Sequence, residues 1–321
     1  MTAYIVGRLI QAVPILIIVS LVGFVVIQAT GDPLAAYTVD ASLTGEDIAR
    51  LRAKYGLDKP VPIQYLNWLK NLLTGDWGRS FYTKKPVIEM VFETLPNTVI
   101  LVAFSYAMTL TIAIALGILT AVRQYSVLDH VITAISFVGI ATPSFWMGLL
   151  LIMFLALRMK AAGLPYLPVG GMFDHRVGKT VPQVLWHVIL PAFTLSFVMA
   201  ARYLRYIRSS VLEELYEDYV RTARSKGLKE RVVFARHVLR NALLPLLTLV
   251  GLGIPSLLSG TIVIESMYTW PGMGRLFWRA AERVDIPILM ALLMFVSVLT
   301  VLSSIVTDVL YAAVDPRIRF T

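Results

Sequence analysis

Six long runs without a charged side chain constrain this sequence more than any other feature. They cover residues 9–31, 98–121, 131–157, 181–201, 241–264 and 286–307. A membrane-spanning helix needs about 20 apolar residues, and backbone groups in lipid must form their hydrogen bonds within the segment. We therefore expect an all-α, polytopic membrane protein with six transmembrane helices. The first run exceeds the apolar part of a signal peptide, which is about 7–15 residues, so we expect it to be retained.

The composition agrees with the membrane class and excludes several others. Hydrophobic residues make up 57% of the 321 residues and charged residues 15%, against about 25% in soluble domains. The net charge of +9 fits loops that face an anionic leaflet, so we do not expect nucleic acid as a partner. The sequence has no Cys, no paired His and no phosphate-binding loop. We therefore expect no metal site, no nucleotide site and no catalytic residues on this chain.

The distribution of basic residues predicts the topology. An even number of spans puts both termini on one side. Segments 1–8, 122–130, 202–240 and 308–321 then hold 14 Lys and Arg in 70 residues, and the opposite loops hold 15 in 110. Because cytoplasmic loops are enriched in Lys and Arg, we expect both termini in the cytosol and the protein in the cytoplasmic (inner) membrane.

The sequence divides into four parts. We expect an N-terminal helix over 1–31, an external loop with short helices over 32–97, a transmembrane domain over 98–311 and a cytosolic tail over 312–321. In the loop, Thr44-x-x-Asp47 predicts a helix start, and residues 63–73 predict a second amphipathic helix. This loop is either a simple interfacial cap or a landing surface for an external partner.

Residues 202–240 are the longest polar interruption in the C-terminal half, with ten basic and five acidic residues. Helical periodicity predicts one helix over 212–226, with an ion pair between Glu217 and Arg221, a turn at Gly227 and a second helix over 229–240. Two interpretations stay open: a hairpin that lies on lipid headgroups, or a helix that inserts into a groove of a soluble partner. The spans carry no mid-membrane ionisable relay, which disfavours an ion-coupled secondary carrier.

Several strings resemble one family of transporters. They are Asp-Tyr-Val-Arg-Thr-Ala-Arg-Ser-Lys-Gly-Leu at 218–228, Arg-Asn-Ala-Leu-Leu-Pro at 240–245, Gly-Asp-Trp-Gly-Arg-Ser at 75–80, Pro-Ser-Phe-Trp at 143–146, Trp-Pro-Gly-Met-Gly-Arg at 270–275 and Asp-Pro-Arg at 315–317. In this order they resemble the permeases of binding-protein-dependent ABC importers, and most closely the B-type subunit of the dipeptide, oligopeptide and nickel family. The general Glu-Ala-Ala signature is replaced here by Arg221, Thr222 and Ala223.

The resemblance implies a type I ABC importer permease fold, like that of the methionine importer. It implies a second homologous permease, two cytosolic ABC ATPases that hold ATP and Mg, and an external substrate-binding protein, with no cofactor on this chain. The implied substrate is a di- or oligopeptide. Nickel, glutathione or an oligosaccharide are alternatives within the family, and an ion-coupled carrier is a more distant one.

The resemblance also implies two sets of functional residues. A coupling helix over about 217–227 would dock on an ATPase, with Tyr219 and Ala223 toward its groove and Arg221 and Arg224 at its rim. The full coupling set is Glu217, Asp218, Tyr219, Arg221, Thr222, Ala223, Arg224 and Gly227. An outer gate or binding-protein contact would involve Trp270, Pro271, Gly272, Gly274 and Arg275, and the alternative for this segment is an interfacial Trp followed by a tight turn.

Overall fold

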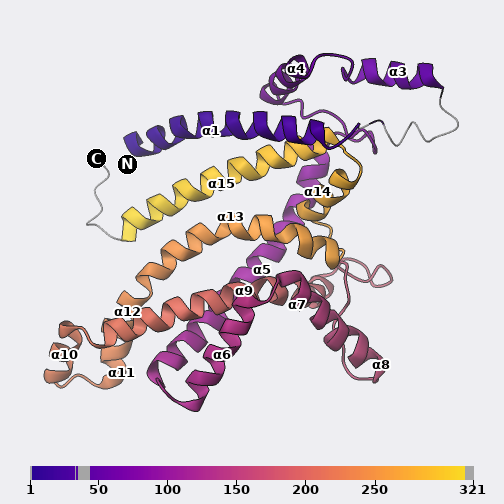
Figure 1. Ribbon diagram of the computed structural model, residues 1–321. Coiled ribbons are helices and arrows are strands. Elements are labelled where there is room, and N and C mark those ends of the chain that lie inside the picture. The colour runs from indigo at the N-terminus through magenta and orange to yellow at the C-terminus, as the bar shows by residue number, and fades with distance from the viewer. Residues whose placement is uncertain (1, 33, 35–43, 315–321) are drawn as a thin grey trace. The chain divides into compact units, whose positions relative to one another are not determined.

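The computed structural model describes residues 2–32, 34 and 44–314, which form helices joined by loops (Figure 1). Among these residues the one β-type pairing is an isolated bridge between Arg79 and Pro86. The chain divides into two compact units. Unit 1 comprises residues 1–98 and 271–302, and unit 2 comprises residues 99–270 and 303–321.

Five stretches of the described residues are long and apolar enough to cross a membrane. They lie in α1 (Thr2–Ala29), α5 (Val87–Val122), the segment Ser144–Ala161, α9 (Val181–Leu215) and α15 (Ile286–Val314). The helix α13 (Leu244–Met267) corresponds to the remaining predicted run, 241–264. The all-α architecture is therefore confirmed, and the helices are consistent with six spans.

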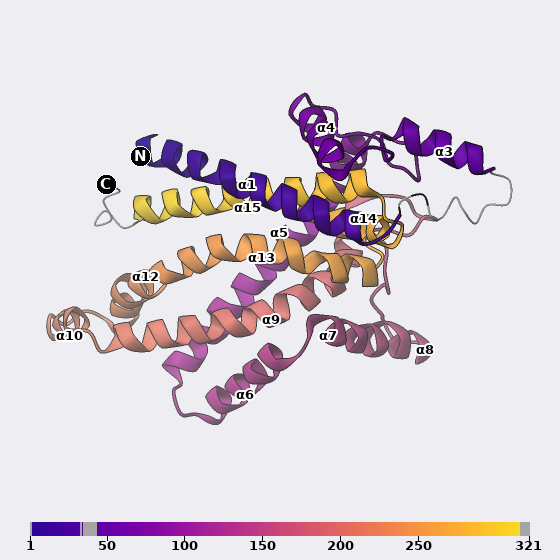
Figure 2. The ribbon, with the colours of Figure 1, turned by 45° about the horizontal axis from the view of Figure 1, so that its top comes forward.

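The predicted helix over 131–157 is wrong as one continuous element. Instead α6 (Val127–Ala141) ends before Pro143, and the chain continues as α7 (Ser144–Leu151), a π-helical segment η1 (Ile152–Arg158) and α8 (Met159–Ala161). Thr142 is extended, with φ −84° and ψ 125°, because a residue before proline is disfavoured in the helical region. The two parts run in clearly different directions in both views (Figures 1 and 2).

Two helices extend furthest beyond the runs that predicted them. The helix α5 begins at Val87 and therefore takes the last part of the predicted loop 32–97, with Pro96 inside it. The helix α9 continues past residue 201 to Leu215. Charged residues near the ends of both helices interrupt the apolar runs, so the runs alone do not reveal that the helices continue. The last residues of the predicted tail, 315–321, lie outside the described residues.

Unit 1 holds α1, the short helices α3 (Gly45–Lys54), α4 (Val61–Leu73) and α14 (Met273–Glu282), and the first part of α15. The predicted capping box of Thr44 and Asp47 is confirmed, as is the helix predicted over 63–73. The helix α1 lies beside this part of α15 (Figures 1 and 2). A Cβ on Gly23 would lie 2.1 Å from a methyl group of Leu293, so the glycine permits this close packing.

Unit 2 is built around α9, which packs against α6, α7 and α13. The helices α9 and α13 run side by side in both views (Figures 1 and 2). Two tyrosine hydroxyl groups tie them together with α5: Tyr203 donates to Leu249 O at 2.8 Å and Tyr106 donates to Val250 O at 2.5 Å. A Cβ on Gly253 would lie 2.3 Å from both hydroxyls, so this contact requires glycine.

Candidate functional site

The first part of the polar segment 202–240 is the last part of α9, and residues 216–242 fold as a hairpin at the end of this helix (Figure 1). Its elements are α10 (Asp218–Ser225), α11 (Glu230–Val233), a π-helical turn η2 (Phe234–Val238) and α12 (Leu239–Ala242). The predicted single helix over 212–226 is wrong, because α9 ends at Leu215 and Glu217 has the extended backbone of a helix N-cap. The predicted turn at Gly227 is confirmed by its φ of +74°.

Two small apolar side chains fix α10 to its own unit. Val220 and Ala223 are one helical turn apart and are 0% and 5% exposed. They lie in a buried cluster with Val211 of α9 and with Val233 and Val238 of the returning arm of the hairpin. The expectation that Ala223 faces a partner's groove is therefore wrong. The sequence showed an apolar stripe on this helix, but the stripe is covered by the chain itself.

The opposite side of α10 is polar and exposed. Arg221 pairs with Asp218 at 3.4 Å rather than with Glu217, so the predicted ion pair is wrong. Arg224 forms a bidentate pair with Glu230, at 2.7 Å and 3.1 Å. Hydrogen bonds from Arg224 lower the pKa of Glu230, which keeps this pair charged. The exposed members of the predicted coupling set are Glu217, Asp218, Tyr219, Arg221, Thr222, Arg224 and Gly227.

Tyr219 is held by residues of α9 and of the hairpin, although it is 36% exposed. Its hydroxyl contacts the Glu214 carboxylate and accepts a hydrogen bond from Asn241 Nδ2 at 2.9 Å. Burial and the neighbouring charges of Glu217 and Glu213 raise the pKa of Glu214. The contacts of the Tyr219 hydroxyl join the end of α9 to α10 and α12, so the hairpin is a preformed unit with a charged outer surface.

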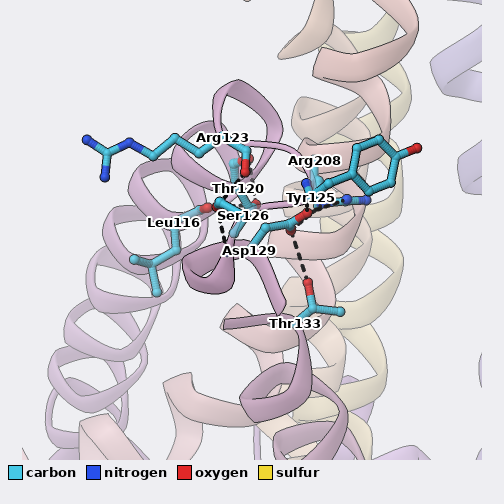
Figure 3. Close-up of polar contacts among 9 residues, drawn as sticks. Leu116, Thr120, Arg123, Tyr125, Ser126, Asp129, Thr133 and Arg208 are labelled. Carbon is cyan, nitrogen blue, oxygen red and sulfur yellow. Dashed lines mark hydrogen bonds and ion pairs between the residues drawn. The ribbon is translucent and has the colours of Figure 1, made fainter. Parts of the chain in front are cut away.

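A partly buried ion pair that the sequence did not predict anchors α9 to the start of α6 (Figure 3). Arg208 Nε and Nη2 donate to the two Asp129 oxygens at 3.0 Å and 2.9 Å. The backbone N–H of Tyr125 and the hydroxyl of Thr133 also donate to this carboxylate, which is 3% exposed. The hydrogen bonds from Arg208 lower the pKa of Asp129. In the sequence, the helix-capping pattern Ser126-x-x-Asp129 before an apolar run was the feature that could have pointed to Asp129.

The second predicted set, residues 270–275, is divided between the units. Trp270 is 0% exposed and lies in the core of unit 2, so the expectations of an interfacial Trp and of a direct partner contact are both wrong for this residue. In unit 1, Pro271 O accepts from Asn97 Nδ2 at 2.8 Å, and Gly272 precedes the first residue of α14. Gly274 is buried and Arg275 is partly exposed. A gating role for Trp270, and a gating or binding role for Pro271, Gly272, Gly274 and Arg275, stay predictions.

Comparison with known proteins identifies the family. Residues 113–320 match the model of the binding-protein-dependent transport system inner membrane component, and residues 1–102 match the model of the N-terminal part of such components. The chain belongs to this family. It is therefore the membrane component of a binding-protein-dependent ABC importer, as the sequence motifs indicated, and a multi-pass inner-membrane protein.

Curated relatives match this family member over its full length. The chain is 42% identical to the oligopeptide transport system permease protein AppB of Bacillus subtilis (strain 168), with 100% of both chains covered. It is 38% identical to a putative peptide permease protein of Brucella suis biovar 1 (strain 1330), again with 100% of both covered.

The fold resembles that of a solved ABC importer. A chain from an inward-facing structure of the MetNI methionine ABC transporter aligns with a TM-score of 0.57 and 14% identity. The alignment covers 72% of this chain and 99% of that chain. The predicted methionine-importer-like fold is therefore confirmed. At this identity the similarity concerns the fold alone.

Proposed function

We propose that this chain is a permease subunit of an ATP-driven importer of di- or oligopeptides and forms half of the translocation pathway. The observation that carries the proposal is the full-length 42% identity to an oligopeptide permease protein. The absence of a nucleotide-binding motif in the sequence supports hydrolysis of ATP, with its Mg, on separate subunits. The partners are a second homologous permease, two cytosolic ABC ATPases and an external substrate-binding protein.

The charged outer surface of α10 docks on one ATPase in this proposal. Val220 and Ala223 hold α10 against the chain's own core, so a push on α10 is transmitted to the permease rather than absorbed by a loose loop. The α9 helix is continuous from Val181 to Leu215 and leads directly into the hairpin. ATP-driven closure of the ATPases then moves α10 and α9 together, which opens the pathway alternately to each side. Both termini are cytosolic in this arrangement.

Co-purification followed by an ATPase assay tests the proposed function. The full chain is purified in mild detergent from its native cells, together with whatever subunits accompany it, and ATP hydrolysis is measured with peptide and binding protein. We expect a second permease and two ATPases in the complex, and hydrolysis stimulated by peptide-loaded binding protein. A chain that purifies alone, in a preparation without ATPase activity, would overturn the proposal in favour of an independent carrier.

A variant pair tests the coupling role of the hairpin. Proline cannot adopt the φ of +74° found at Gly227, so Gly227→Pro should distort the α10–α11 turn and abolish peptide-stimulated hydrolysis while membrane insertion is retained. Gly178→Pro is the matched control. Like Gly227, Gly178 has a positive φ (+88°), open space where a Cβ would lie, and a backbone N–H that donates a hydrogen bond of 2.9 Å. Equal stimulation in the two variants would contradict the coupling assignment.

A further inference from the structure

Unit 1 contains a cavity of about 260 Å³ that the coupling proposal does not use. Its walls come from the end of α1, the connection between α3 and α4, α4 itself, residues 76–81 and the start of α15. The aromatic side chains on these walls are Phe24, Tyr55, Trp68, Trp77 and Phe81. The remaining wall is rich in carboxamides and charges. Such a mixture of apolar walls and a few polar groups is typical of a small-molecule site.

One carboxamide oxygen on the wall is buried without a hydrogen-bond partner. Gln64 Nε2 donates to Lys59 O at 2.7 Å, which leaves Gln64 Oε1 as an acceptor. Gln28 Nε2 donates to this oxygen at 3.3 Å. Gln28 Oε1 is thereby directed away from Gln64, and it has no partner among the residues that the structure describes. A buried acceptor left unpaired is costly, so this oxygen favours a ligand that brings an N–H donor.

The cavity wall also offers charges of both signs. Lys54 and Arg79 supply cations, and Lys54 forms no ion pair within the described part of the chain. Asp76 supplies a carboxylate, which also accepts from the Gly78 N–H at 2.9 Å. A zwitterionic ligand complements such a wall, because its carboxylate meets a cation and its ammonium meets the carboxylate.

We propose that this cavity is a binding site for a short peptide with free termini. Rotation of the Gln28 carboxamide lets its Oε1 accept from a backbone N–H of the peptide, and an apolar side chain of the peptide lies against the Trp68 and Trp77 rings. The volume lies just below the range of about 300–1,000 Å³ for ligand pockets, which favours a dipeptide over a longer chain. This inference rests on the proposed peptide function, and it adds a binding site for the substrate on the permease itself.

Calorimetric titration of the full chain in lipid nanodiscs tests the site. The probes are the dipeptide Ala-Phe and its end-blocked form, N-acetyl-Ala-Phe-amide. We expect saturable 1:1 binding of Ala-Phe and at least about tenfold weaker binding of the blocked peptide, because blocking removes both charges. No saturable binding, or equal binding of the two peptides, overturns the proposal. This comparison uses the unaltered protein and therefore does not depend on the folding of any variant.

A substitution then tests the role of the unpaired oxygen. Gln28→Leu keeps a side chain of similar size and removes the acceptor, so we expect the affinity for Ala-Phe to fall about tenfold. Gln124→Leu makes the same exchange at a residue that does not line the cavity, and it should bind Ala-Phe like the unaltered chain. If Gln28→Leu also binds like the unaltered chain, the assignment of Gln28 is overturned.

The two proposals fail in different ways. Uptake of Ala-Phe into proteoliposomes that contain the whole importer measures the proposed function, whereas the titration measures the cavity. Uptake without binding to the isolated chain overturns the cavity site and leaves the importer function standing. No peptide uptake under any condition, with the whole importer present, overturns the proposed function itself.

Discussion

Two buried carboxylates, one in each unit, are stabilised by opposite means. Asp129 in unit 2 receives both of its main contacts from the guanidinium of Arg208. Asp285 in unit 1 is 2% exposed and receives only neutral donors within the described residues: the Ser80 hydroxyl at 2.5 Å and the backbone N–H groups of Phe81 and Tyr82 at 3.1 Å and 3.4 Å. The chain thus uses an ion pair to join the helices α6 and α9, and neutral hydrogen-bond donors to hold a loop.

The difference indicates which carboxylate should lose most stability when one of its partners is removed. A buried ion pair that loses its cation leaves an uncompensated charge, whereas a carboxylate with three neutral donors loses a fraction of its support with each change. Arg224 and Glu230 provide a third case, because they have the same bidentate geometry on an exposed surface. The following predictions use the three carboxylates in order of expected effect.

Removal of the cation from the Asp129 pair should have the largest effect. We expect Arg208→Met to lower the free energy of unfolding by about 4 kcal/mol, because it leaves the Asp129 charge buried and unpaired. Arg202→Met is the control, since Arg202 lies on the same helix and is exposed. Denaturant titration in detergent measures both. Recovery in the double variant Asp129→Leu with Arg208→Met would show that the unpaired charge causes the loss, and no recovery would contradict this.

Substitution of Asp285 by Asn should cost less. The amide keeps one acceptor oxygen but turns an NH₂ group toward the donors of Ser80, Phe81 and Tyr82, so we expect a loss of about 2 kcal/mol. The same denaturant titration measures it. A loss equal to that of Arg208→Met would contradict the distinction between neutral and charged support.

Acidification should weaken the Asp129 pair in a defined direction. Arg208 holds the pKa of Asp129 below that of the unfolded chain, which is about 3.9. The unfolded state therefore binds a proton first as pH falls, so the pair contributes fully above about pH 5, and its contribution is lost progressively as the pH drops through the unfolded and then the lowered pKa. We expect Asp129→Asn to reduce the acid-induced fall in melting temperature between about pH 5 and about pH 3. An identical profile in the variant would disprove the link.

Loss of the exposed pair should have the smallest effect. The side chains of Arg224 and Glu230 are 40% and 65% exposed, so water screens their attraction. We expect Glu230→Gln to change the free energy of unfolding by about 0.5 kcal/mol, as the denaturant titration would measure. A change above about 2 kcal/mol would contradict the expectation that the exposed pair contributes much less to the free energy of unfolding than the Asp129 pair does.

The sequence by itself determined the class, the positions of the long helices and the family. These properties can be recognised from the composition, because a segment that crosses lipid must be apolar over its whole length. Predictions that depend on residues close together in the sequence were also confirmed, as for the capping box at Thr44 and the left-handed turn at Gly227. The same logic failed at Pro143, where an apolar run is compatible with either one helix or two.

Only the tertiary structure decided which side of each amphipathic helix meets the chain itself. The periodicity of α10 showed an apolar stripe, but packing against Val211, Val233 and Val238 decided that Ala223 faces inward and that a charged surface is left for a partner. Distance along the chain likewise concealed the pairing of Asp129 with Arg208 and of Asp285 with Ser80. The physical reason is that burial and charge pairing depend on neighbours in space, whereas periodicity reports only neighbours along one helix.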